Sequence, residues 1–99
     1  MTTIYVASFC TYADYECLRD DHGMEDMESY AIGMTACAGL DRAKVLEVAK
    51  RMLEAEMIDT EELTEDDELT YAEEDSGTTQ VSLGAEPAAC IVIREFEGV

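Results

Sequence analysis

Residues 41–57, with the sequence DRAKVLEVAKRMLEAEM, decide the fold class of this chain. Apolar side chains recur there every three or four positions, which is the period of a helix with one buried face. Asp41 suits the N-cap position, because its carboxylate can accept hydrogen bonds from the first free backbone amides. We therefore expect a helix from about Asp41 to Met57. Its buried face would contain Val45, Leu46, Ala49, Met52, Leu53 and Met57.

Segments of strand character lie on both sides of this helix. Ile4–Cys10 is rich in β-branched and aromatic residues, and its nearly continuous apolar character favours an interior place in a sheet. Ala89–Phe96 is apolar at first and alternates later, and Thr79–Leu83 alternates apolar with polar residues. The pattern predicts a turn at Gly84–Pro87 between these two strands. Glu68–Ala72 is a weaker strand candidate.

The segment between the first strand and the helix is harder to interpret. The first strand could continue through Tyr12 and Tyr15, and the polar run from Arg19 to Gly23 predicts a turn. Residues 24–38 fit two periods: helical spacing of methionines, or an alternation of apolar residues that favours a strand. We expect a strand at Ser29–Ala36 that returns beside the first one.

These elements predict one α+β domain that spans residues 1–99. One amphipathic helix would pack on one face of a mostly antiparallel sheet of four or five strands. Ninety-nine residues suit a single domain, and 47% apolar residues are sufficient for a core.

Charge is the most unusual property of the sequence. Asp and Glu total 24 against 6 Lys and Arg, which gives a formal net charge of −18. From Ile58 onward thirteen acids face a single base, Arg94, and ten of these acids lie in Asp59–Asp75. Like-charge neighbours disfavour a helix there, so we expect a loop leading into an edge strand. Phosphates repel such a surface, which argues against direct binding of nucleic acid.

Other chemistry has little support. The four cysteines lack the close pairs of a structural zinc site, and Cys37 and Cys90 have the context of small buried hydrophobes. Glu65–Ser76 lacks the glycine that a calcium-binding EF-hand loop needs. His22 is the only histidine, and no catalytic motif is present. We expect no enzyme, cofactor or metal site. Met1–Thr3 does not begin a signal peptide, and no apolar run is long enough to span a membrane, so we expect a cytoplasmic protein.

Several interpretations of the acids remain open: a solvated face that aids solubility, adaptation to high salt, a weak cation site, or a surface that stands in for a phosphate backbone. In size, acidity and the run Glu61–Glu68, the chain resembles the class of small phage-encoded inhibitors, which includes anti-CRISPR proteins and other DNA mimics. This class shares no single fold, so the resemblance assigns no residue. It implies a stoichiometric inhibitor of a host defence complex or DNA-handling complex.

The leading hypothesis is a non-enzymatic protein that docks on a basic, nucleic-acid-binding protein and blocks access of DNA or RNA. Tyrosines are favoured interface anchors, so Tyr71 joins the acids as a candidate contact. The alternative is a small accessory subunit that assembles through apolar strands, with Ile91–Ile93 as an exposed edge. The candidate partner-binding residues are Asp20, Asp21, Glu61, Glu62, Glu65, Asp66, Asp67, Glu68, Tyr71, Glu73, Glu74 and Asp75.

Overall fold

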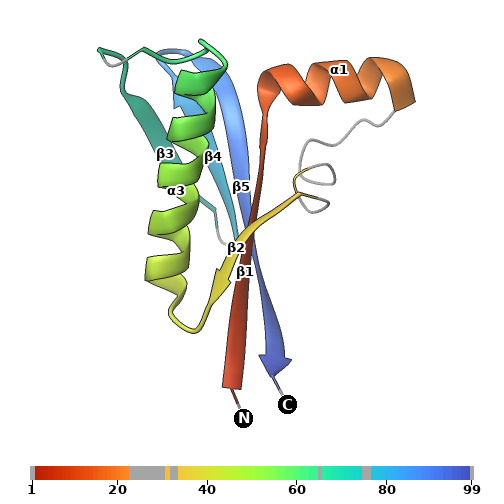
Figure 1. The fold of residues 1–99 in the computed structure, drawn as a ribbon, viewed down its shortest axis with the longest axis vertical. Coiled ribbons are helices and arrows are strands. Elements are labelled where there is room, and N and C mark those ends of the chain that lie inside the picture. The colour runs from red at the N-terminus through yellow and green to blue at the C-terminus, as the bar shows by residue number, and fades with distance from the viewer. Residues whose placement is uncertain (1, 23–30, 32–33, 65, 75–76, 99) are drawn as a thin grey trace.

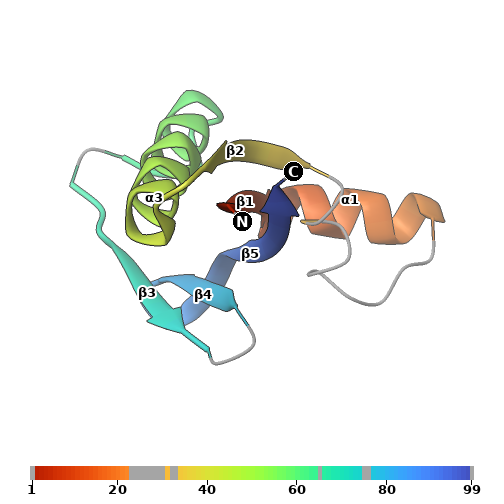
Figure 2. The same ribbon diagram turned by 90° about the horizontal axis from the view of Figure 1, so that it is seen from below.

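A computed structural model describes residues 2–22, 31, 34–64, 66–74 and 77–98 of the chain. Within them a five-stranded antiparallel sheet has the order β2-β1-β5-β4-β3. The sheet curves around one long helix, and a second helix lies near the opposite face (Figures 1 and 2). The elements are β1 (Thr2–Thr11), α1 (Tyr12–His22), β2 (Thr35–Gly39), α3 (Arg42–Asp59), β3 (Leu69–Glu73), β4 (Thr78–Leu83) and β5 (Glu86–Gly98).

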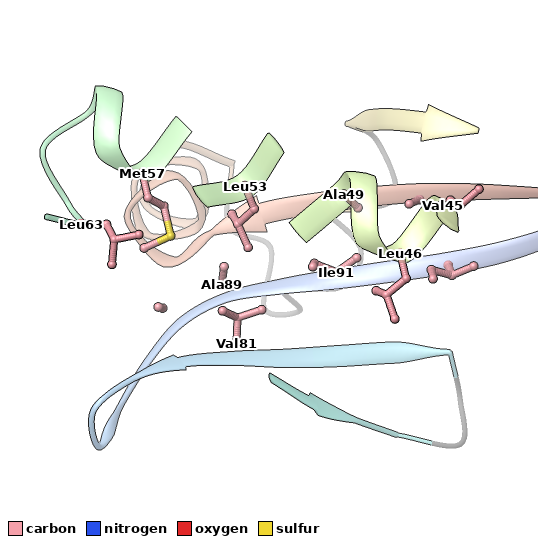
Figure 3. Close-up of a cluster of buried hydrophobic side chains, with 12 residues drawn as sticks. Val45, Leu46, Ala49, Leu53, Met57, Leu63, Val81, Ala89 and Ile91 are labelled. Carbon is pink, nitrogen blue, oxygen red and sulfur yellow. The ribbon is translucent and has the colours of Figure 1, made fainter. Parts of the chain in front are cut away.

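Helix α3 confirms the expected helix, with two corrections: it continues to Asp59, and Met52, expected on the buried face, is 40% exposed. Asp41 is the N-cap, and its Oδ1 accepts hydrogen bonds from the backbone amides of Ala43 and Lys44 at 3.0 and 3.3 Å. The buried face of α3 packs into the concave side of the sheet (Figure 3), which places the main core between these two layers. The helix supplies Val45, Leu46, Ala49, Leu53 and Met57 to this core, and the strands supply Ala7, Val81, Ala89, Ile91 and Ile93.

Alternation along the strands builds a second, smaller core on the other side of the sheet. Cys10 and Cys90 are cross-strand partners in the β1–β5 ladder, and each is 1% exposed. Tyr15 of α1 packs on them, together with Ala31 and Val92. Every second residue of an interior strand faces this side, and α1 covers part of it.

The α+β class, the antiparallel sheet and the interior place of β1 are confirmed. The described residues contain two helices, however, where one was expected. The proposed continuation of β1 through Tyr12 and Tyr15 is wrong, because Thr11 ends the strand and starts α1: its Oγ1 accepts a hydrogen bond from the amide of Asp14 at 3.2 Å. The turn predicted from Arg19 is also wrong, since α1 runs to His22; Gly23 lies outside the described residues.

The strand expected at Ser29–Ala36 exists with different bounds. It pairs antiparallel with β1 as predicted, but it covers Thr35–Gly39. Ala31 is helical and fully buried, and the amide of Met34 donates to its carbonyl at 3.0 Å, so the strand does not include these two residues. Ser29, Tyr30, Ile32 and Gly33 lie outside the described residues.

The last two strands are confirmed, with one correction to the turn between them. Gly84 and Ala85 form the turn, whereas Glu86 and Pro87 already belong to β5. Pro87 is tolerated because it lies next to the register shift at Val81/Ser82, where a missing amide donor disturbs the ladder least. The exposed edge proposed at Ile91–Ile93 is wrong, because β5 is the central strand, with β1 and β4 on its two sides.

Candidate functional site

The C-terminal end of α3 is acidic, although negative charge at this end of a helix is unfavourable. Its last turn contains Glu56 and Asp59 and no base. The carbonyl end of a helix carries partial negative charge, so carboxylates there destabilise the helix slightly. Glu61 and Glu62 follow at once, which concentrates further negative charge at this end.

A buried anchor fixes the loop that leaves α3. The amides of Glu62 and Leu63 both donate to the carbonyl of Met57, at 2.8 and 3.0 Å. Glu61 adopts a left-handed backbone conformation with φ of 64°, which reverses the chain. Leu63 is then 5% exposed in the main core, while Glu61 is exposed and Glu62 half-buried. The expected loop after Asp59, followed by the edge strand β3, is therefore confirmed.

Three elements bring carboxylates together around Glu62. Partial burial raises the pKa of the Glu62 carboxyl, and the negative charges of Asp14 in α1 and Glu56 in α3 raise it further. The same two charges contribute to the pKa of the Cys10 thiol, which burial raises to about 11. Glu62 also lines a hollow with Glu86 of β5, Tyr12 and Pro87. These acids are far apart in the sequence, and only the fold makes them neighbours.

A second group of acids lies between the C-terminal part of α3 and the start of β3. Asp67 and Glu68 line a hollow of about 330 Å³ together with Glu54 and Ile58 of α3. Asp67 has a structural role as well, because its Oδ2 accepts hydrogen bonds from the amide and the hydroxyl of Thr64, each at 3.0 Å. We call the two groups together the acidic end. It comprises Asp14, Glu54, Glu56, Glu62, Asp67, Glu68 and Glu86, with their sequence neighbours Asp59, Glu61 and Asp66. The C-terminal end of α3 is its upper end in Figure 1.

The predicted site residues divide between several places. Glu61, Glu62, Asp66, Asp67 and Glu68 lie in the acidic end. Glu73 and Glu74 are exposed at the other end of β3. With a rise of about 3.3 Å per residue, Glu73 lies roughly 17 Å from Glu68 along the strand. Asp20 and Asp21 belong to α1, but their side chains lie outside the described part, as do Glu65 and Asp75.

Tyr71 is engaged within the fold. Its hydroxyl donates to Oε1 of Glu54 at 2.8 Å, and the ammonium of Lys50 lies 4.7 Å from its ring centroid. Burial and the Glu54 carboxylate both raise the pKa of Tyr71 above its ordinary value. The ring is half-buried against the main core, so it fixes β3 to α3.

Sequence reasoning missed Asp14, Glu54, Glu56 and Glu86 as members of the surface. Asp14 stands alone after a strand, Glu86 stands in a turn, and the two α3 residues belong to a helix of nearly balanced charge. One signal was available: no Lys or Arg occurs between Arg51 and Arg94, so nothing after the middle of α3 could neutralise nearby acids. The basic residues of α3 lie in its N-terminal and middle turns, with Arg51 paired to Glu47 at 3.6 Å.

Within the described residues no group of three His, Cys, Asp or Glu side chains could hold a metal ion. No described helix combines the length and the apolar character needed to cross a membrane. No protein-family model, curated protein or solved structure matches the chain. The geometry and charge of its own residues are therefore the basis for a functional assignment.

Substitution of Glu62 tests the crowding of these acids. A raised pKa means that the folded state holds the proton more tightly than the unfolded chain, so the free energy of unfolding falls as the pH rises through the folded-state pKa. Glu62→Gln removes this penalty and is expected to raise the melting temperature near neutral pH. The gain should shrink as the pH falls toward the ordinary glutamate pKa of about 4.3. The exposed Glu73→Gln is the control and should have a smaller effect; an equal or opposite effect of Glu62→Gln would contradict the crowding.

Salt provides a second test of the same repulsion. Raising NaCl from about 10 mM to about 150 mM shortens the Debye length from roughly 30 Å to 8 Å, which screens the acids from one another. The melting temperature is expected to rise over this range, equally in NaCl and KCl, because screening does not depend on the cation. A flat melting temperature in differential scanning calorimetry would show that self-repulsion is weak.

Proposed function

We propose that this protein is a non-enzymatic, cytoplasmic binding protein whose acidic end docks on the basic groove of a nucleic-acid-binding protein and blocks the access of DNA or RNA. The observation that carries the proposal is the convergence of Asp14, Glu56 and Glu62 from three separate elements, at a helix end that disfavours negative charge. These carboxylates lower the stability of the fold, so a role in binding explains their position better than a role in folding does.

The electrostatics suit such a partner. The last turn of α3 contains no base, and its four bases lie in its N-terminal and middle turns, with Lys50 over the ring of Tyr71. Its field reaches about one Debye length, roughly 8–10 Å at cellular ionic strength, and steers a cationic partner during encounter. Leu63 and the Asp67–Thr64 hydrogen bonds hold the loop in place, so less ordering entropy is lost on binding.

The more specific form of the proposal is inhibition of a host defence complex or DNA-handling complex, in the manner of the anti-CRISPR and DNA-mimic class that the chain resembles in size and acidity. The alternative of an accessory subunit cannot use Ile91–Ile93 as its edge, because that segment lies in the central strand.

An affinity experiment tests the proposed role. The immobilised protein is exposed to a nuclease-treated lysate, so that basic grooves are free, and bound proteins are eluted first with a DNA duplex and then with rising salt. The expected result is a retained nucleic-acid-binding protein that the duplex displaces and that elutes at moderate salt. Retention of only proteins that the duplex does not displace, or no retention at all, would overturn the proposal.

A further inference from the structure

The outer edge of β2 lacks charge and proline, although the strand is short and its register with β1 shifts between Cys37 and Thr35. Thr35–Gly39 contains no charged residue and no proline, and in the described part of the chain no strand pairs with its outer side. Natural proteins usually guard such edges with charge, proline or a covering element. The opposite edge of this sheet follows that rule: β3 has acids immediately before it, at its end and after it.

Exposed apolar side chains gather beside this unguarded edge. The six large hydrophobic residues that are exposed among the described residues include Met34 (44%) directly before β2 and Leu40 (69%) directly after it. Val48 and Met52 lie on the neighbouring surface of α3. A hollow of about 330 Å³ opens between β2 and α3, and its lining, which includes Leu40 and Val48, is mainly apolar.

The sequence beside β2 is neutral, unlike the rest of the molecule. Residues 34–48 contain two bases and two acids, a net charge of zero within a chain of −18. Two copies of a strongly anionic chain can approach most easily through the surface that lacks net negative charge. This feature favours a second copy as the occupant of the edge.

We propose that two copies of the chain pair antiparallel through β2, with Cys37 of each copy on the two-fold axis. In this register Met34 of one copy lies opposite Leu40 of the other. The two-fold axis repeats this contact, so both exposed residues of each copy are covered. The two sheets join into one, and both α3 helices lie on the same face, where each borders the apolar hollow beside β2. The interface is isologous, which is the commonest arrangement of homodimers.

This dimer is independent of the proposed docking function. The β2 edge is next to the N-terminus of α3 and the acidic end is at its C-terminus, about 27 Å apart for 18 residues at 1.5 Å each. Both surfaces can therefore be occupied at once. Their salt dependence differs in sign: docking of the acidic end weakens with salt, whereas dimerisation of two anions strengthens as salt screens their repulsion.

Sedimentation equilibrium tests the dimer with the untagged, reduced protein. In about 200 mM NaCl, where the Debye length is roughly 7 Å, we expect twice the chain mass of 11.0 kDa at micromolar concentration. In about 10 mM NaCl the dissociation constant should be at least about tenfold larger, because the charges are then hardly screened. A monomer at every salt concentration up to the highest soluble concentration would overturn the proposal, whatever the affinity experiment shows.

A charge exchange tests the register. Met34→Lys or Leu40→Glu alone is expected to raise the dissociation constant about tenfold or more, because each places a charge against an apolar partner. The double variant Met34→Lys/Leu40→Glu should regain most of the affinity, because each introduced cation then faces an introduced anion, and its net charge is that of the wild type. The control Ile58→Lys/Phe96→Glu exchanges the remaining two exposed hydrophobics and should dimerise normally. No recovery in a folded double variant, checked by circular dichroism, would refute this register, and loss of the dimer in the control would refute the edge.

Discussion

Charge reversal at the acidic end is expected to weaken binding to the partner by about two orders of magnitude or more, equivalent to roughly 3 kcal/mol. The triple variant Glu61→Lys, Asp66→Lys and Glu68→Lys introduces three cations where a cationic groove would approach. All three side chains are exposed, so the substitutions remove no core contact. Like charges brought together at an interface each add a penalty, and their effects accumulate because the sites are close. The measurement is the dissociation constant by isothermal titration calorimetry against the captured protein.

A second triple variant separates local charge from total charge. This variant reverses three exposed acids outside the acidic end: Glu47→Lys, Glu95→Lys and Glu97→Lys. Each of the two triple variants changes the net charge from −18 to −12. The affinity of this second variant is expected to fall less than about tenfold, because charges beyond a Debye length are screened. Equal losses in the two variants would mean that the partner senses overall charge, and no loss in the first would place the binding site elsewhere.

Truncation of Leu53 is expected to give the largest loss of stability. Its side chain is fully buried between α3 and the sheet, at the middle of the main core (Figure 3). Leu53→Ala loses the transfer free energy of the removed carbons and leaves a cavity, which together cost about 3–5 kcal/mol. For a domain of this size, that loss lowers the melting temperature by about 15–30 °C. Urea denaturation followed by circular dichroism measures the change in the free energy of unfolding.

The control for this prediction lies on the same helix. Ile58 is 47% exposed. Ile58→Ala removes as many side-chain carbons as Leu53→Ala does, but it leaves no closed cavity. We expect a change below about 1 kcal/mol, because most surface substitutions have small effects. If the two variants lose similar stability, the core does not lie where α3 meets β1 and β5.

Local sequence patterns determined the elements whose signals lie within a few residues. The α3 helix follows from its 3.6-residue period and from the side chain of Asp41, and β4 and β5 follow from alternation and β-branched residues. The loop after Asp59 follows from repulsion between adjacent acids. Each of these is a short-range effect, so the sequence alone was sufficient to predict it. The α+β class results from these elements, because a helix and strands with one apolar face must cover each other.

Tertiary contacts decided the remaining features. Tyr12 and Tyr15 are aromatic and favour a strand. Thr11 caps a helix instead, and the packing of Tyr15 on Cys10 and Cys90 stabilises that helix. The strand order made Ile91–Ile93 central and left β2 at an edge, and neither position is encoded in local periodicity. Asp14, Glu56 and Glu62 become neighbours only because α1, α3 and the loop after it meet at one end of the sheet. The sequence by itself determined how much negative charge the protein has, whereas the tertiary structure decided where it is concentrated, because the interaction between charges depends on their distance in space and not along the chain.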